Sequence, residues 1–225
     1  LWIDGAGMTQ INGYSVTTSG TQTFDQMLIL GRSTTLSASR VIFNTPVTGS
    51  SLSVLGSSTI NTSSITTTGA QRFAGGVTLT ADTTLSTSGS SAVTFESTLD
   101  GAYNLLVNSA GTTTFGGAVG ASSALNTLTT NVGGSLVISG ASVTTNGAQV
   151  YGETTTMSLN GDTTLTGPQI TWRAPMTGTG FLRVVGVANL QGGSISTAGH
   201  QRYSGPVNLL VNTELITTNN ANITF

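Results

Sequence analysis

The chain has 225 residues, 6% of them charged, and its formal net charge is −2. All six basic residues are Arg and they are scattered, whereas nucleic-acid binding needs clustered Lys and Arg, so no nucleic-acid partner is expected. Cysteine is absent, which excludes disulfides and thiolate zinc sites. No apolar run reaches the roughly 18 residues of a membrane span, so membrane insertion is not expected.

One short run recurs four times along the chain. Each copy has a Gly, a Gln two residues later and an aromatic residue two residues after the Gln. The anchors are Gly20, Gln22 and Phe24; Gly69, Gln71 and Phe73; Gly147, Gln149 and Tyr151; and Gly199, Gln201 and Tyr203. The glycines are spaced by 49 (20 to 69), 78 (69 to 147) and 52 (147 to 199) residues. Self-similarity at a fixed period indicates a repeat architecture.

The flanks of the run repeat as well. They comprise Thr-Thr-Leu at 34–36, 83–85 and 163–165; an aromatic-ended triplet at 41–43, 93–95, 170–172 and 223–225; and Leu-x-Val at 52–54, 105–107 and 182–184. One solenoid array over 1–225 is therefore expected, with units 1–51, 52–104, 105–181 (one extra coil) and 182–225 (incomplete). Residues 1–3 match the closing Leu-x-Val pair, and Leu1 is not Met, so we expect a piece of a longer product.

The long middle spacing predicts the coil size. A stacked solenoid gains whole coils, so an extra 26 to 29 residues in a period of about 50 predicts two coils per unit, or about nine coils of about 25 residues. Short β-branched and aromatic stretches separated by Gly, Asn, Asp and Ser indicate strands and turns, and no helical periodicity is present. The sequence predicts an all-β parallel β-helix rather than a sandwich or barrel, because those have no reason to repeat their sequence.

The runs at 66–73, 81–85 and 93–101, which read TTTGAQRF, ADTTL and VTFESTLDG, resemble large bacterial exoproteins of the filamentous-haemagglutinin-like kind. The resemblance covers essentially the whole chain. It implies a right-handed β-helix, secretion by a two-partner or autotransporter route, and an extracellular or cell-surface stalk or adhesive fibre. The N-terminal secretion domain of such proteins is not visible in this sequence.

Few side chains suggest chemistry. The single His200 has no marked partners, so we interpret it as a surface or turn residue. Glu96 and Asp100 form a conceivable acid pair, although most of the acids precede Gly or Thr-Thr and fit turns. The four Gln side chains are interpreted as corner braces at equivalent corners, and Arg72 and Arg202 share a repeat position. The carboxylates are Asp4, Asp25, Asp82, Glu96, Asp100, Glu153, Asp162 and Glu214.

The preferred functional hypothesis is a structural stalk or fibre segment of a secreted or cell-surface bacterial adhesin or filament. It needs no catalytic residue, cofactor or metal, and its partners are further solenoid turns or other copies, with a host-surface or glycan receptor as a possible ligand. One alternative is a glycan- or ice-binding face. Ice binding is suggested by the Thr runs 66–68, 112–114 and 154–156, although these fall at different phases of the repeat. A polysaccharide-active β-helix enzyme is the other alternative, and it requires two acids about 5 to 9.5 Å apart.

Overall fold

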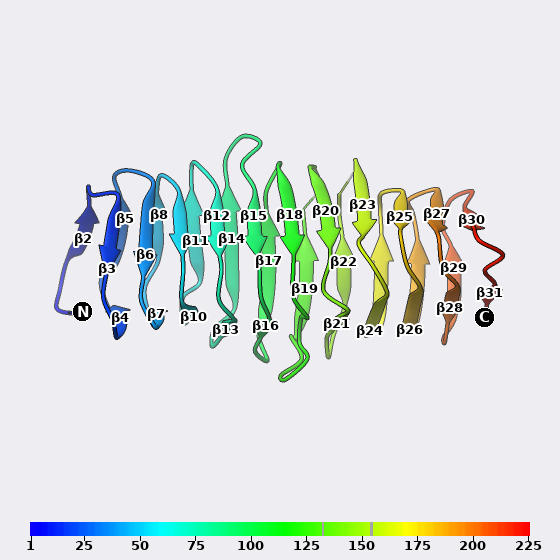
Figure 1. Cartoon of the computed structure of the whole chain (residues 1–225), viewed down its shortest axis with the longest axis horizontal. Helices are drawn as coiled ribbons and strands as arrows, with labels where there is room; N and C mark the ends of the chain where they lie inside the picture. The colour runs from blue at the N-terminus through cyan, green and yellow to red at the C-terminus, as the bar shows by residue number, and fades with distance from the viewer. Residues whose placement is uncertain (132, 154) are drawn as a thin grey trace.

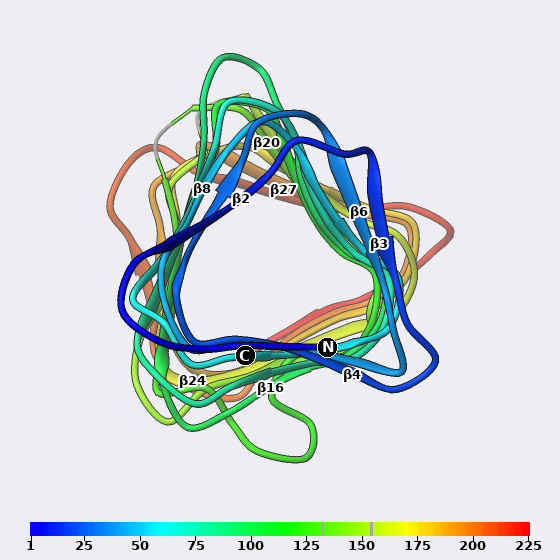
Figure 2. The same ribbon diagram turned by 90° about the vertical axis from the view of Figure 1, so that its left-hand side faces the viewer.

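The chain forms a rod of parallel β-strands. The computed structural model describes residues 1–131, 133–153 and 155–225, and its two termini lie at opposite ends of the rod (Figure 1). Seen from the N-terminal end, the coil is triangular and the chain runs clockwise as it recedes (Figure 2), so the coil is right-handed. The predicted fold class, an all-β parallel β-helix, is confirmed. No helix in the described part of the chain is long and apolar enough to cross a membrane.

The rod has three sides, which we name A, B and C in the order in which the chain visits them. Side A begins with β1 (Trp2–Ile3), β4 (Thr21–Phe24), β7 (Arg40–Phe43), β10 (Ser57–Ile60), β13 (Val77–Leu79) and β16 (Leu99–Asp100). Side B contains β2 (Met8–Ile11), β5 (Met27–Leu30), β8 (Val47–Gly49), β11 (Ser64–Thr67), β14 (Thr83–Thr87), β17 (Asn104–Asn108), β19 (Thr127–Thr130) and β22 (Gln149–Tyr151). Side C contains β3 (Ser15–Thr17), β6 (Thr34–Ser37), β9 (Leu52–Val54), β12 (Gln71–Phe73), β15 (Val93–Phe95), β18 (Thr112–Phe115), β20 (Ser135–Ile138), β23 (Thr156–Leu159), β25 (Met176–Gly178), β27 (Ser194–Thr197) and β30 (Glu214–Thr217).

Side A is irregular in its second half. After β16 it continues through single bridges from Leu99 to Val119 and from Val119 to Val143. Two long strands then run around the corner from side A to side B, so that each one serves both sides. The remaining strands are β21 (Ser142–Thr144), β24 (Thr163–Trp172), β26 (Leu182–Leu190), β28 (Gln201–Tyr203) and β31 (Ile223–Thr224), which complete side A, and β29 (Val207–Leu209), which ends side B.

The number of turns differs from the predicted number of coils. Side C alone has 11 strands, one per turn, so the rod has about 11 turns rather than nine. Turns differ in length: the step from Ile42 to its register partner Thr59 is among the shortest, and the step from Val119 to Val143 is the longest among the described register pairs. The coil size was estimated from the added turn, which is among the longest in the rod. The estimate therefore exceeded the average number of residues per turn. At about 4.8 Å per turn the rod is roughly 53 Å long.

The repeat unit also differs from the prediction of two coils per unit. From Gln22 on β4 to Gln71 on β12 the chain passes eight strand positions, and with three sides this makes two and two-thirds turns. Gln149 to Gln201 again spans eight positions, because β24 and β26 each count twice. Gln71 to Gln149 spans eleven, because the bridge at Val119 adds one. The insertion is therefore one whole turn, as the stacking argument requires.

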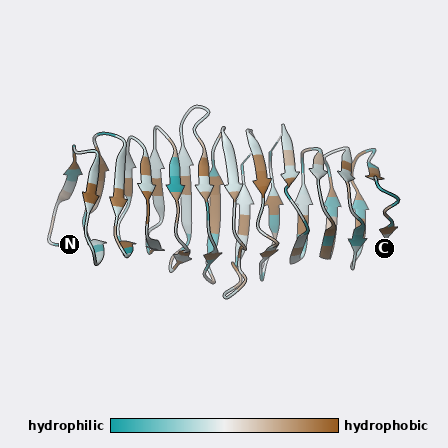
Figure 3. Cartoon of the chain, in the orientation of Figure 1, coloured by the Kyte–Doolittle hydropathy of each residue, from teal (hydrophilic) through white to brown (hydrophobic). Residues whose placement is uncertain are grey.

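The core is a set of columns, each one residue wide. Strand residues alternate between inside and outside, and each inward side chain packs on its counterpart one turn away. On side B the column Leu28, Val47, Ile65, Leu85 and Val107 is fully buried. Hydrophobic residues are distributed along the whole rod and not gathered at one place (Figure 3). The repeating sequence thus stacks like side chains on like.

Candidate functional site

The four corner glutamines have the same surroundings. Each side chain is fully buried, and each Nε2 donates to the backbone oxygen of the residue six positions earlier. These acceptors are Val16 at 3.0 Å, Ile65 at 3.0 Å, Val143 at 3.3 Å and Ile195 at 3.2 Å. Each Nε2 also donates to a carbonyl of the following turn, namely Ser37 at 3.1 Å, Ser86 at 2.8 Å, Thr166 at 2.8 Å and Ile216 at 2.7 Å. The amide therefore ties its own corner to the next turn.

These corners are equivalent in contacts but not in their place on the rod. Gln22 and Gln201 lie on side A, Gln71 on side C and Gln149 on side B. We expected Gln22, Gln71 and Gln201 at equivalent corners: their hydrogen bonds are equivalent, whereas the sides of the rod on which they lie are not all the same. The reason is the two-and-two-thirds-turn unit, which moves each successive copy to another side. Because all three sides are parallel sheets with inward and outward alternation, one local sequence suits any of them.

The anchor glycines are explained by space. A Cβ on Gly69 would lie 2.0 Å from Ser51 Oγ, and on Gly147 2.7 Å from the backbone oxygen of Asn126. On Gly199 it would lie 2.8 Å from the Gly180 backbone. Nothing lies within 4 Å of such an atom on Gly20, which is close to the N-terminal end of the rod. Close approach of the preceding turn, rather than an unusual backbone angle, accounts for three of the four glycines.

The anchor aromatics form stacks along the core. Phe24 packs on Phe43, with ring centroids 5.9 Å apart. Phe73 packs on Phe95 and Tyr203 packs on Phe225, at 5.4 and 5.5 Å. The aromatic-ended triplets of the sequence are therefore the partners of the Gln-x-aromatic runs one turn later.

The phenol hydroxyls complete the glutamine corners. Tyr151 donates to Gln149 Oε1 at 2.9 Å and Tyr203 donates to Gln201 Oε1 at 3.0 Å. Where the aromatic is Phe, the corresponding oxygens of Gln22 and Gln71 are buried and have no hydrogen-bond partner among the described residues. The four anchor sets thus act as structural joints of the coil.

Most carboxylates join neighbouring turns. Three accept backbone N–H groups from the turn that follows: Asp82 from Asn104 at 2.9 Å, Asp100 from Ser122 and Ser123 at 2.8 and 3.1 Å, and Asp162 from Phe181 at 2.8 Å. The bonds from the backbone and side chain of Asn104 hold the pKa of the Asp82 carboxyl below its ordinary value. Asn44, which donates to Asp25 at 2.5 Å, and Trp2 lower the pKa of that carboxyl in the same way.

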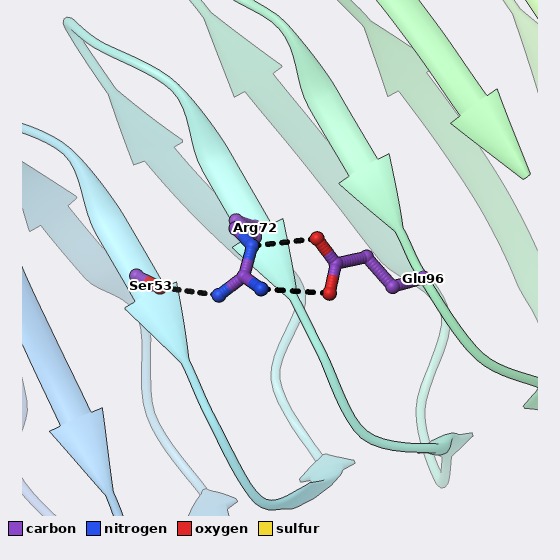
Figure 4. A network of polar contacts seen from close by, with 3 residues as sticks. All are labelled: Ser53, Arg72 and Glu96. Carbon is purple, nitrogen blue, oxygen red and sulfur yellow. Dashed lines mark hydrogen bonds and ion pairs between the residues drawn. The ribbon is translucent and has the colours of Figure 1, made fainter. Parts of the chain in front are cut away.

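Glu96 and Asp100 do not act as a pair. Both Glu96 oxygens accept from Arg72, whose Nε and Nη2 lie 2.7 Å away, and Arg72 Nη1 reaches Ser53 Oγ at 3.4 Å (Figure 4). Asp100 is held separately by backbone N–H groups. Among the described carboxylates only Asp4 and Glu214 make no side-chain hydrogen bond or ion pair, and they lie near opposite ends of the chain. No described group of three or more His, Cys, Asp or Glu residues could hold a metal.

Glu153 is different because it is buried inside the coil. Its side chain is 2% exposed and its Oε2 has no hydrogen-bond partner among the described residues. Burial raises the pKa of this carboxyl, and a hydrogen bond to Thr130 opposes the shift only in part. No sequence signal marked Glu153, because its turn position resembles those of the exposed acids.

The basic residues form no broad patch. Arg72 lies on side C and Arg202 on side A, although they share a repeat position. Sequence reasoning missed a different pair: Arg183 and Arg202 are register partners on adjacent strands of side A, and neither has a polar partner in the described part of the chain. The signal was their spacing along the chain, which is that of a single turn.

His200 is exposed, and its Nδ1 accepts the backbone N–H of Asn222 at 2.8 Å.

The threonine runs do not form one surface. Residues 66–68 lie at the end of β11 on side B, while 112–114 and 155–156 lie on side C, with β20 between those two turns. Thr154 lies outside the described residues. Thr67 and Thr113 point inward and are buried.

Two shallow grooves lie on side B. The larger, of about 390 Å³, is lined by Ser63, Asp82, Thr83, Thr84, Asn104, Leu105, Leu106, Thr127 and Thr129. The other, of about 290 Å³, is lined by Thr48, Gly49, Thr66, Thr67, Thr68, Ser86, Thr87 and Ser88. Ser and Thr are the most numerous residues in both linings, although the surface that they and their neighbours present to the grooves is mainly apolar.

Comparison with known proteins found no match among protein-family models, curated proteins or solved structures. The resemblance to filamentous-haemagglutinin-like exoproteins therefore remains an expectation based on the sequence runs alone.

Proposed function

We propose that this chain is a structural rod segment, a stretch of stalk or fibre in a secreted or cell-surface bacterial adhesin or extracellular filament. The observation that carries the proposal is the engagement of its polar residues. Each recurrent Gln, and most of the carboxylates, join one turn to the next. Because its recurrent polar contacts hold neighbouring turns together, the chain is suited to form a long rod.

The low charge of the chain supports a long stack of turns. Stacked turns place equivalent side chains about 4.8 Å apart, where like charges repel and Thr, Ser and Asn ladders cohere. Such ladders are present: Asn61 donates to Asn44 at 3.0 Å, and Asn126 donates to Asn104 at 2.7 Å. A chain with only 6% charged residues is therefore what a long stack of turns favours.

Immunogold labelling tests this proposal. Antibodies raised against residues 1–225 are applied to intact and to permeabilised source cells and viewed by electron microscopy. We expect label on intact cells, along filaments or stalks. Label found only after permeabilisation would contradict the proposed location and role.

A glycan-binding face on side B is the second candidate, favoured by the larger groove with its hydroxyl rim and the apolar Leu106. Leu106 points outward and is 37% exposed. If glycans bind there, Leu106→Lys abolishes binding on a glycan array, while Leu55→Lys, at an exposed apolar residue just after β9 on side C, leaves it unchanged. Absence of binding by the unmodified chain, or equal loss in both variants, would exclude this candidate.

A further inference from the structure

Side A brings two arginines together on neighbouring strands. Arg183 of β26 and Arg202 of β28 are register partners and point outward, and such strands lie about 4.8 Å apart. Their outward partners on the next strands are Thr164 and Thr224. Among the described register pairs, no other pair joins two charges of the same sign. Because like charges on neighbouring strands repel, this pair needs a physical explanation.

The described part of the chain supplies no counter-charge for this pair. Neither arginine has a polar partner there, and Arg183 Nε is shielded from solvent without a hydrogen-bond acceptor. Asp162, at the corner before β24, is already engaged, since its Oδ1 accepts the backbone N–H of Phe181 at 2.8 Å. Arg72 of side C, by contrast, donates from Nε and Nη2 to Glu96. The counter-charge for the two arginines of side A therefore has to come from outside this part of the chain.

A third donor lies beside the arginine pair. His200 is exposed and precedes Arg202 by two residues, at the corner where β28 begins. Its Nδ1 accepts the backbone N–H of Asn222 at 2.8 Å, so the neutral ring carries its proton on Nε2. Two residues of extended chain span about 6.6 Å. An anion bound to Arg202 can therefore also accept a hydrogen bond from His200 Nε2.

We propose that Arg183, Arg202 and His200 form a binding site for a phosphate monoester. Each guanidinium offers parallel N–H groups that match two oxygens of a phosphate. A phosphate monoester carries a charge of about −1.5 to −2 near pH 7, which balances two arginines. The outward neighbours Thr164 and Thr224 present hydroxyls rather than apolar groups, so the expected carrier of the phosphate is polar, such as a sugar.

This site is separate from the features discussed above. It lies on side A, whereas both grooves lie on side B. It adds a ligand class to the rod function and does not rest on it.

Calorimetric titration with glucose 6-phosphate tests the three residues, with ionic strength held constant because salt screens exposed charges. We expect one ligand per chain. Arg183→Gln and Arg202→Gln should each raise the Kd at least about tenfold, and His200→Ala about threefold. An unchanged Kd in any of these variants would overturn the place of that residue in the site.

The matched control is Arg173→Gln. Arg173 is exposed, follows β24 at the corner towards side C, and has no arginine as a register partner. The substitution removes the same charge as Arg202→Gln and should leave the Kd unchanged. Equal losses in both variants would show general attraction of an anion by positive charge and would overturn the site.

Two further ligands test the chemical class. Glucose 6-sulfate has the same sugar and a tetrahedral group with one charge fewer, so it should bind at least about tenfold more weakly. Equal binding of the sulfate would overturn the assignment to a phosphate monoester. Binding to vesicles that contain phosphatidic acid, without binding to glucose 6-phosphate, would overturn the polar carrier.

Thermal unfolding checks the variants for correct folding. Arg202→Gln removes a like-charge contact and should be at least as stable as the unmodified chain. Glucose 6-phosphate should raise the Tm of the unmodified chain and not that of Arg202→Gln. Absence of binding to the unmodified chain at about 10 mM ligand would overturn the site. That result would leave the rod-segment proposal intact, since immunogold labelling decides it independently.

Discussion

At the scale of single residues, the buried side-chain amide of one Gln donates to backbone carbonyls at the corner in each of the four repeated runs. A buried carbonyl without a donor costs about 1 to 3 kcal/mol, so one Gln that serves two carbonyls contributes more than its apolar surface would. The sequence predicted these Gln residues as braces because they recur. It did not predict which carbonyls they bind, since those lie one turn away and depend on the turn length.

Exchange of Tyr and Phe should change stability in opposite directions. Tyr203→Phe leaves Gln201 Oε1 buried without a donor and should cost about 1 to 2 kcal/mol of unfolding free energy. Phe73→Tyr should stabilise by about 1 kcal/mol, because it supplies the donor that Gln71 Oε1 lacks. Urea unfolding followed by circular dichroism measures both. Equal effects of the same sign would contradict this role of the hydroxyl.

Glu153 should make the fold less stable as pH rises. Its pKa is raised in the folded chain, so above the ordinary carboxyl pKa the unfolded chain ionises first. Stability is therefore lost from about pH 4.3 up to the folded pKa, with a slope approaching about 1.4 kcal/mol per pH unit. Glu153→Gln should remove this slope and be the more stable form at neutral pH.

The control is Glu96→Gln, at an exposed ion pair, which should change stability by less than about 1 kcal/mol. Asp25 and Asp82 have lowered pKa values and act with the opposite sign at more acid pH, in all variants alike. An unchanged slope in Glu153→Gln would show that another group carries it.

At the scale of elements, strands pair with strands one turn away, and the repeated flanks predicted which ones are equivalent. Ser64 and Ile65 pair with Thr84 and Leu85, and the same pairing recurs in the other units. The number of sides could not be predicted. Two-sided and three-sided coils use the same short strands, and their corners are made from the same Gly, Ser and Asn.

The middle ring of an aromatic stack should matter most. Phe95 lies between Phe73 and Phe115, with centroids 5.4 and 5.5 Å away. Phe95→Ala removes both contacts and leaves a cavity, so it should cost about 3 to 5 kcal/mol. Phe225→Ala, at a ring that is 74% exposed, is the matched control and should cost under about 1 kcal/mol. Urea unfolding compares the two, and equal costs would contradict the stack as a source of stability.

At the scale of the whole molecule, the rod tolerates change in steps of one turn. In the middle of the rod the turn has the same length on all three sides, since the steps from Val77 to Leu99, from Gln71 to Val93 and from Thr84 to Leu106 are equal. The natural insertion between the second and third copies of the run shows that a whole turn can be added. Sequence spacing alone predicted this rule, although it gave too large a turn.

Deletion of residues 77–98 should therefore preserve the fold. It removes one turn and brings Phe73 onto Phe115, which keeps the aromatic stack. Deletion of residues 77–87, half as long, shifts later strands to the wrong sides and should abolish cooperative folding. Circular dichroism and light scattering distinguish a folded, shorter rod from an aggregate. Equal behaviour of the two deletions would contradict the stacking rule.

The two-and-two-thirds-turn unit has a consequence for how the rod is seen from outside. The outward residue of the Gln-x-aromatic run is Thr23 on side A, Arg72 on side C, Val150 on side B and Arg202 on side A again. A residue at a fixed position of the repeat unit therefore lies on a different side of the rod in each successive unit. A binding partner that contacts one side of the rod meets this residue only in every third unit, here after nine turns or about 43 Å. The added whole turn increases the distance along the rod between the second and third of these residues, but it does not change the side on which each one lies.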